Sequence, residues 1–319
     1  MRGWKVVGLL FLLSTTIELV QLRIPGRESA LGDMVANTLG ALAGVGLAWW
    51  LPRRHRSARA GFVAAAAVLG LIAAIGFAFT PSFPRTIYFG QWTPELGQYE
   101  TYRGKVLSAQ IGGMQLHSWS VPDSKVVRDR LLGGEMLRVT AVAGPRTGAV
   151  APVFNIYDDG PREIVLLGAD GGDLVLHVRL HATDLLLRQP DLRWRGALAA
   201  VKTGDTIALG FRRAPPGYCL SLNGRERCRF AYTAGQAWGL IQFFPRLSAR
   251  TQSALSVLFM VVLGICMGGF VRRDAAGYVA IGVVLAGAVV VPMLFGLAPT
   301  PLLQLGGLAA GIAGAAFIP

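Results

Sequence analysis

Long apolar runs at both ends of the chain constrain its fold more than any other sequence feature. Within residues 1–80 and 249–319 lie five uninterrupted runs of about 20 residues and one shorter run. A helix needs ~20 apolar residues to cross a hydrocarbon core of ~30 Å. Because 53% of all residues are hydrophobic and only 15% are charged, the composition excludes an ordinary soluble or disordered chain.

The positions of these runs predict a multi-domain membrane protein with a six-helix transmembrane bundle. The central residues 81–248 form an insert between the third and fourth helices, for which we expect an all-β, jelly-roll-like sandwich. The expected helices cover residues 6–22, 31–51 and 60–80 in the segment 1–80, and residues 251–271, 275–298 and 300–317 in the segment 249–319.

Basic residues between the runs predict the orientation, because cytoplasmic loops are rich in Lys and Arg. Four arginines lie within residues 52–59, and Arg272 and Arg273 separate the fourth and fifth helices. With both loops inside, the insert 81–248 is extracytoplasmic and both termini are cytoplasmic, in the inner membrane. The alternative is that residues 1–22 form a cleaved signal, but no small-residue cleavage site follows them.

The net charge of +13 raises the question of nucleic-acid binding. The insert accounts for +6 and the end segments for +7, and most basic residues of the end segments lie beside apolar runs. That distribution is typical of charges that orient a membrane protein. We therefore expect the lipid bilayer, and no nucleic acid, as a partner.

Polar residues gather at the outer ends of the first two helices. Glu18 and Gln21 share one helix face, Asp33 and Asn37 share another, and Arg27 lies on the connecting loop. Ionisable groups inside a membrane are costly and commonly functional, so these five residues form a candidate binding pocket. The structural alternative is a set of interhelical hydrogen bonds that only hold the two helices together.

The order and spacing of these residues resemble the signature of VanZ-like membrane proteins. The resemblance covers about residues 1–50 and rests on Ile17-Glu18-x-x-Gln21, Pro25-Gly26-Arg27, Ser29, Asp33-x-x-x-Asn37-Thr38-x-Gly40 and Gly44. It implies a bacterial cytoplasmic-membrane protein, in a family whose best known member is linked to glycopeptide antibiotic resistance. It also makes Glu18, Gln21, Arg27, Asp33 and Asn37 the preferred site residues.

The insert contains short alternating runs bounded by turn residues, which predict strands. In residues 174–181 we expect the even-numbered side chains to face the core and Val175, His177, Arg179 and His181 to face a solvated or ligand-binding side. The other expected strands are Val153–Tyr157, Glu163–Leu167, Thr206–Arg212, Cys219–Leu222, Arg225–Tyr232 and Ala237–Phe243.

The sequence around Asn223-Gly224 predicts a two-residue type I′ hairpin. Counting outward from the turn pairs Leu222 with Arg225 and brings Cys219 opposite Cys228. Cysteines at directly opposed positions lie within reach of a disulfide. A disulfide requires an oxidising compartment, which agrees with an extracytoplasmic insert.

The hairpin Leu-Ser-Leu-Asn-Gly after Gly204-Asp205-Thr206, together with the Phe-x-Ile-Tyr strand, loosely resembles a concanavalin A-like or laminin-G-like domain. That resemblance implies a sandwich of a kind often used to bind carbohydrate. Two metal alternatives are weaker: His177 with His181, and a calcium site built from aspartates that are ordinarily turn residues. Four tryptophans could stack on sugars or belong to the core, namely Trp92, Trp119, Trp194 and Trp238.

We expect the protein to recognise an envelope glycan or glycolipid, with no cofactor and no metal. One alternative is a membrane-embedded enzyme that acts on a lipid-linked precursor with Glu18 or Asp33 as acid or base. No His or Cys accompanies these carboxylates to activate a nucleophile. The other alternative is a structural or assembly partner.

Overall fold

The structure is a computed structural model that describes residues 57–97, 99–119, 121–242 and 247–317, together with Gly8, Leu12, Thr15 and Thr16. The chain divides into two units, residues 1–57 and residues 58–319. Apart from those four residues, the expected helices 6–22 and 31–51 lie outside the described residues.

Three helices of the second unit are long and apolar enough to cross a membrane. They are α3 (Ala58–Ala78), α7 (Ala249–Gly268) and α8 (Ala275–Leu294), with mean hydropathies of 2.3, 1.8 and 2.2. The sequence ends in a shorter apolar helix, α9 (Leu302–Phe317), whose 16 residues are fewer than the ~20 needed for a perpendicular span. The described residues thus give three of the six expected spans.

Close backbone contacts hold α7 against α9. Glycine removes the side chain where the helices meet: a Cβ added to Gly264 would overlap the Leu308 carbonyl oxygen. A Cβ added to Gly311 would overlap the Val261 carbonyl oxygen. Small residues at such positions let membrane helices approach closely. The Gly307-x-x-x-Gly311 spacing of α9 is typical of such close packing.

The basic ends of the helices lie together. Gly61, near the start of α3, neighbours Phe270 and Val271, which follow α7. The Arg273 guanidinium donates to the Ala316 carbonyl at the end of α9 through Nε and Nη2, at 3.1 and 2.8 Å. The first turn of α3, the loop between α7 and α8, and the end of α9 therefore occupy one side of the helices.

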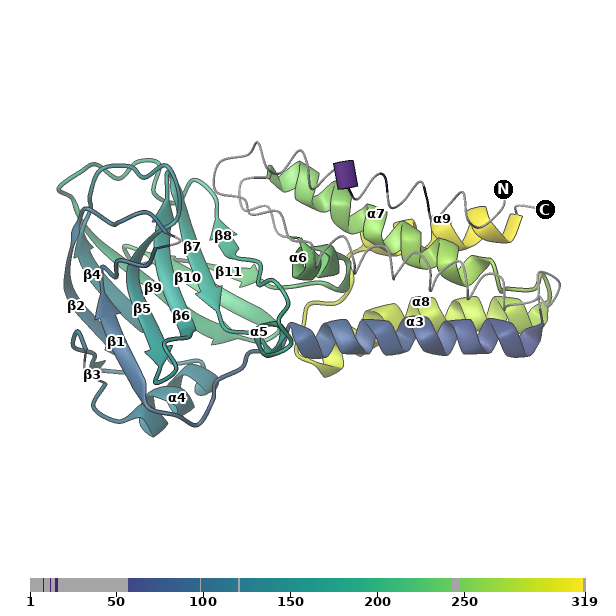
Figure 1. Ribbon diagram of the computed structural model, residues 1–319, viewed down its shortest axis with the longest axis horizontal. Helices are drawn as coiled ribbons and strands as arrows, with labels where there is room; N and C mark the ends of the chain where they lie inside the picture. Colours follow the sequence, from purple (N-terminus) through teal and green to yellow (C-terminus); the bar gives the residue numbers. More distant parts are fainter. Residues whose placement is uncertain are drawn as a thin grey trace. The chain divides into compact units, whose positions relative to one another are not determined.

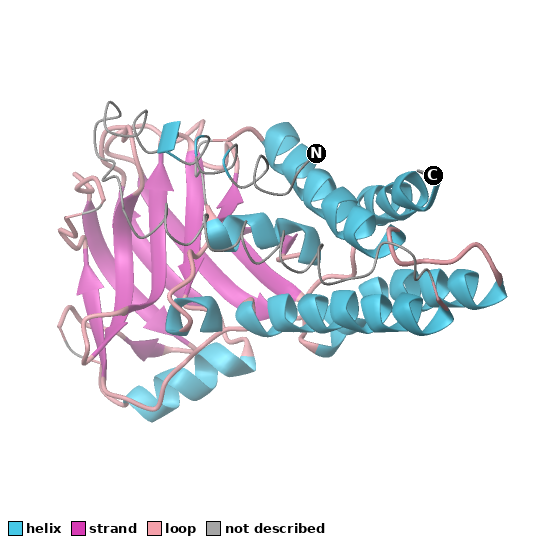
Figure 2. Cartoon of the chain, turned by 45° about the vertical axis from the view of Figure 1, so that its right-hand side comes forward, coloured by secondary structure: helices cyan, strands magenta, loops and turns pink. Residues whose placement is uncertain are grey.

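Two antiparallel sheets occupy the insert and pack face to face around one apolar core (Figures 1 and 2). The five-stranded sheet has the order β1 (Tyr88–Trp92), β5 (Ala151–Asp158), β6 (Glu163–Asp170), β7 (Asp173–Val178) and β8 (Leu192–Trp194). The six-stranded sheet has the order β11 (Arg225–Phe230), β10 (Gly217–Leu222), β9 (Thr206–Ala214), β4 (Leu137–Val142), β2 (Lys105–Ile111) and β3 (Met114–Gln115).

Residues from both sheets fill the core. Phe154 and Ile156 of β5 are fully buried, as are Ile111 of β2 and Leu137 of β4, and all four belong to one cluster. Alternation in each strand puts these side chains on the inner faces. A two-layer sandwich is therefore what the alternating sequence pattern specifies.

Several helices of the insert were not expected. The helix α4 (Ser124–Gly133) begins where the Asp123 side chain accepts a hydrogen bond from the Val126 N–H. Within the strand expected at residues 237–243, residues 237–241 belong instead to the 3-10 helix η1 (Ala234–Ala237) and to α6 (Trp238–Ile241). A capping box between Thr233 and Gln236 starts this helical segment. The strand prediction for this segment was wrong.

The sandwich is joined to the helices by buried aromatic contacts. Phe79, just after α3, stacks on Tyr232 with ring centroids 4.8 Å apart. Leu297, after α8, belongs to the sandwich core, and Phe295 packs against it. The short helix α5 (His181–Asp184) contacts α3, and η1 contacts α7. The sandwich and these helices therefore share one packed junction.

Candidate functional site

The five polar residues predicted for the N-terminal pocket lie outside the described residues. Glu18, Gln21, Arg27, Asp33 and Asn37 therefore remain predictions. The described part of the chain offers a different candidate, on the face of the five-stranded sheet that points away from the core.

Aromatic and polar side chains share this outer face because β1 and β5 are in register. Phe89 pairs with Tyr157, and Gln91 pairs with Asn155 two residues along. Residues two apart in a strand point to the same side. The rings of Phe89 and Tyr157 stack with centroids 5.4 Å apart, and both side chains are half-buried. This gives the face an accessible aromatic platform.

Tyr99, Glu163 and His177 form a hydrogen-bonded cluster on the same face. The Tyr99 hydroxyl donates to Glu163 Oε2 at 3.2 Å, and His177 Nδ1 lies 3.1 Å from that oxygen. A carboxylate only accepts, so the proton between them belongs to His177 Nδ1. Burial disfavours the imidazolium, but the hydrogen bond to Glu163 and the charge of Asp191 outweigh it and raise the pKa of His177.

Two buried polar atoms of this face lack a hydrogen-bond partner among the described residues. They are Asn155 Oδ1, on a residue that is only 1% exposed, and His177 Nε2. Unsatisfied buried polar atoms are uncommon and call for an explanation. Both atoms have almost no exposed surface, so they lie beneath the half-buried side chains of this face. No serine, threonine or cysteine is hydrogen-bonded to His177 among the described residues, so the cluster has no activated nucleophile there.

The strand β7 differs from its prediction on this side. Val175 is fully buried and Arg179 is only 3% exposed. The Arg179 guanidinium donates to Asp158 Oδ2 and to Asp184 Oδ1, each at 2.7 Å. The expectation of a uniformly solvated or ligand-facing side was therefore wrong. Only His177 of the expected residues lies in the candidate site, and Arg179 is a buried structural cation.

Arg179 also connects the sandwich to the segment that leaves α3. Its carbonyl accepts from the Ser82 N–H at 2.8 Å, and the Ser82 hydroxyl donates to Asp184 at 2.8 Å. Burial raises the pKa of Asp158, but the Arg162 N–H and the Arg179 guanidinium outweigh that effect and lower it. Asp184 is also held below its usual pKa, because bonds from Arg179 and Ser82 overcome its partial burial.

Arginine side chains and turn N–H groups bind the carboxylates of the aspartates that were considered as calcium ligands. Arg193 Nη1 lies 2.6 Å from Asp170 Oδ2 and 3.9 Å from Asp173 Oδ2. Asp158 accepts from the Gly160 N–H at 3.0 Å, as expected for a turn residue. These contacts favour the turn interpretation over a calcium site.

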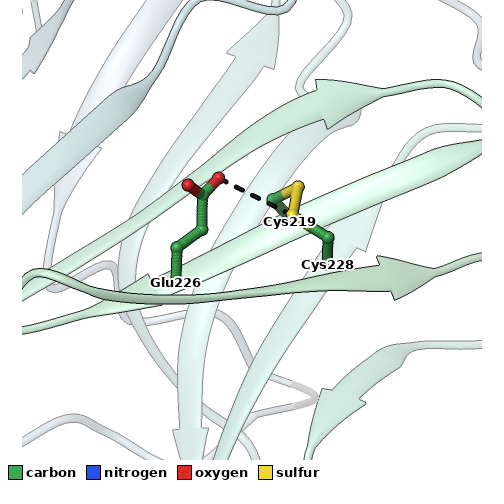
Figure 3. A group of neighbouring side chains, drawn as sticks. All are labelled: Cys219, Glu226 and Cys228. Atoms are coloured by element: carbon green, nitrogen blue, oxygen red, sulfur yellow. Dashed lines mark hydrogen bonds between the residues drawn. A yellow bond between two sulfur atoms is a disulfide. The ribbon is translucent and has the colours of Figure 1, made fainter.

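The disulfide between Cys219 and Cys228 is present, with a Cα–Cα distance of 3.9 Å (Figure 3). As predicted, Leu222 pairs with Arg225, and the next two pairs follow in order. Asn223 and Gly224 have φ values of 49° and 81°, as a type I′ turn requires. Beyond the cysteines the register shifts by one residue on β11, where Arg229 has a φ of 75°.

Glu226 lies beside this disulfide, with one carboxylate oxygen 3.9 Å from Cys228 Sγ (Figure 3). Among the described residues, these three are the one group of potential metal-binding side chains whose ligand atoms all lie within 4.8 Å. Oxidised sulfurs offer no thiolate, and the carboxylate is bound to Arg212 Nε at 2.6 Å. The group is therefore a structural element of the hairpin.

The four tryptophans divide between core and surface. Trp92 and Trp194 are partly buried and pack against the sandwich core. Trp238 donates from Nε1 to Ser256 Oγ of α7 at 3.2 Å. Trp119 is 64% exposed, so it alone of the four remains available for stacking.

Comparison with known proteins gives a family match to the start of the chain. Residues 1–52 match the VanZ/LLP1 family. This segment carries the predicted Glu18, Gln21, Arg27, Asp33 and Asn37, and it is a small part of the 319-residue chain. No curated protein and no solved structure matches the chain. The likeness and the three apolar helices together indicate a membrane-associated protein related to the cell envelope.

Most of the outer-face residues could not be assigned from the sequence. Asn155 and Tyr157 alternate with core residues in a predicted strand. That alternation was enough to predict that their side chains point away from the core. Tyr99 lies in a loop, and β1 with Phe89 was not predicted. The pairing of β1 with β5, of β5 with β6 and of β6 with β7 gathers the strand residues of this face.

Proposed function

We propose that this protein is a bacterial inner-membrane protein whose sandwich recognises an envelope glycan or glycolipid on the extracytoplasmic side. The observation that carries the proposal is the outer face of the five-stranded sheet. It combines the stacked Phe89 and Tyr157 rings with the Tyr99–Glu163–His177 cluster. Aromatic rings offer apolar faces to sugar rings, while oriented polar groups bond sugar hydroxyls.

The size of the internal cavities supports binding at this surface. The cavity near Tyr232 and Phe295 and the cavity near Tyr102 and Leu198 have volumes of about 20 and 30 Å³. Each has room for about one or two water molecules. Neither of these two cavities of the described residues has room for a sugar ring, which favours binding on a face or loop of the sandwich.

Two observations support an extracytoplasmic sandwich. The Cys219–Cys228 disulfide is typical of an oxidising compartment. The first turn of α3 with Arg59, the α7–α8 loop with Arg272 and Arg273, and the end of α9 lie together, whereas the sandwich packs against the opposite ends, around Phe79 and Phe295. Basic loops are retained in the cytoplasm.

The N-terminal segment supplies the second part of the proposal. Its likeness to the VanZ/LLP1 family supports the prediction that Glu18, Gln21, Arg27, Asp33 and Asn37 form a polar pocket near the outer surface. We propose that this pocket binds the membrane-proximal part of the same glycolipid. An anionic headgroup would pair with Arg27.

Binding of the full-length protein in lipid nanodiscs tests the function. The ligands are purified cell-wall fragments, soluble envelope glycans and a lipid-linked cell-wall precursor. We expect at least one to bind, and Tyr157→Ala to weaken binding about tenfold, which corresponds to ~1.4 kcal/mol. The matched control is Tyr278→Ala, since Tyr278 is 64% exposed in the first turn of α8.

Failure of all three ligands to bind would show that the glycan proposal is wrong. Equal affinities of Tyr157→Ala and Tyr278→Ala would exclude the outer face as the binding surface, even if a ligand binds. Thermal melting of both variants shows whether each is still folded. If both are, lost binding is due to the missing ring. Asp33→Asn separately tests the N-terminal pocket against the precursor.

A further inference from the structure

Three consecutive leucines are exposed beside the end of a membrane helix. Leu185, Leu186 and Leu187 follow α5 and are 53%, 96% and 38% exposed. Exposed leucine is ordinary when isolated, but a contiguous apolar patch marks an interaction site. We call residues 185–187 the leucine loop.

The leucine loop has a defined conformation. The N–H of Leu186 donates to the Thr183 carbonyl at 3.1 Å, and that of Leu187 donates to the Ala182 carbonyl at 2.9 Å. Leu186 has a φ of 58°, in the left-handed region that leucine seldom occupies. These bonds hold the most exposed leucine at the tip of the turn.

The end of α3 fixes one side of the loop. The imidazole ring of His181, at the start of α5, lies against the Phe77 ring of α3 with centroids 4.6 Å apart. The His181 N–H donates to the Thr80 carbonyl at 3.0 Å. Figure 1 shows α5 at the end of α3. Phe77 is itself 46% exposed on a helix long enough to span the bilayer.

The short helix α6 fixes the other side. The Arg188 N–H, directly after the loop, donates to the Leu240 carbonyl at 2.7 Å. Ile241, the next residue of α6, is 73% exposed. Trp238 of α6 is hydrogen-bonded to Ser256 of α7, which is another candidate span. The leucine loop thus lies between two segments that are attached to membrane helices.

We propose that the leucine loop inserts into the leaflet of the bilayer that surrounds α3, α7 and α8. Its apolar surface continues the lipid-facing surface of α3 through Phe77 and that of α6 through Ile241. The exposed Arg188 beside it suits the headgroup region, where arginine places its charge in the polar layer. The insertion holds the sandwich close to the lipid surface independently of any glycan ligand.

Depth-dependent fluorescence quenching tests the insertion. The full-length Cys266→Ser protein keeps its disulfide and receives one added cysteine, labelled with an environment-sensitive fluorophore, in nanodiscs that contain spin-labelled lipid. The test position is Leu186→Cys. Leu71→Cys, on α3 and 45% exposed, is the lipid-facing control, and Leu107→Cys, on β2 and also 45% exposed, is the control on the sandwich.

We expect lipid quenchers to reduce emission at position 186 at least about twofold more than at position 107, at a depth of ~5–10 Å below the headgroup boundary. Leu185→Cys should behave in the same way, which guards against a defect specific to position 186. Quenching at 186 by water-soluble quenchers alone would overturn the proposal. Protection from both kinds of quencher would also overturn it, because a protein partner or a second copy would then cover the loop.

Discussion

Arg179 is almost fully buried and shares its guanidinium between Asp158 and Asp184. A buried ion pair gains little over an apolar replacement of the whole pair, but removing one partner leaves an uncompensated buried charge. The network also includes Ser82, which lies two residues after Thr80 in the segment that follows α3. At this scale, therefore, one arginine determines how the sandwich is attached to the chain that leaves the membrane.

We predict that Arg179→Met lowers the free energy of unfolding by ~3–5 kcal/mol, because Asp158 stays buried without its cation. The matched control is Arg162→Met: Arg162 also contacts Asp158, but its side chain is 60% exposed. An exposed partner contributes ~1 kcal/mol or less. Denaturant titration of the full chain in micelles measures both variants. Equal losses would contradict the assignment of Arg179 as the principal partner.

The same network predicts the acid side of the stability profile. The pKa values of Asp158 and Asp184 lie below their usual value of 3.8 in the folded state. Their contribution is therefore complete above that value and is lost as the pH falls through the lowered pKa values. In Arg179→Met this acid dependence should become weaker. An unchanged acid profile would contradict the pairing.

At the scale of elements, glycine determines the contact between α7 and α9. Gly264 and Gly311 each face a backbone carbonyl of the other helix, whereas nothing lies within 4 Å of the position a Cβ would take on Gly314. Gly311 and Gly314 of α9 are three residues apart and about 60° apart around the helix axis, yet only Gly311 meets the backbone of α7. Their surroundings make them a matched pair for substitution.

We predict that Gly311→Ala destabilises the protein by ~1–3 kcal/mol, since the added methyl group would overlap the Val261 carbonyl and force the helices apart. Gly314→Ala should be neutral or slightly stabilising, because alanine favours the helix and meets no neighbour. Thermal unfolding in detergent compares the two. A destabilised Gly314→Ala beside an unaffected Gly311→Ala would contradict the packing of α7 on α9.

Local sequence signals predicted elements well where the determining residues are adjacent. Asn223-Gly224 specified the hairpin and its disulfide, and apolar runs specified α3, α7 and α8. The helical segment after Thr233 was missed, although the capping box with Gln236 was a readable signal. The one-residue bulge at Arg229 has no comparable signal, because it depends on how β11 pairs with β10.

Long-range pairing explains what the sequence could not provide. Arg179 was expected on an open face, but it pairs with Asp158, 21 residues away. Tyr99 reaches Glu163 across 64 residues. Such partners are brought together by the order of the strands in the sheet. The periodicity of a single sequence does not reveal that order. The candidate outer-face site could therefore be predicted only in fragments.

At the scale of the whole molecule, the described residues form apolar helices and a sandwich that share one junction. The junction contains Phe79 stacked on Tyr232, and Leu297 within the sandwich core. The domain is thus packed directly against the ends of membrane helices. The roles proposed for the outer face of the five-stranded sheet and for the leucine loop both depend on which side of the membrane this junction faces.

Labelling from one side of the membrane tests that orientation most directly. In the full-length Cys266→Ser protein, a cysteine replaces either Lys202, in an exposed turn of the sandwich, or Arg272, in the loop between α7 and α8. A membrane-impermeant maleimide is applied to intact spheroplasts and to lysed ones. We predict that Lys202→Cys is labelled before lysis and Arg272→Cys only after it; labelling of Arg272→Cys alone in intact spheroplasts would contradict an extracytoplasmic sandwich.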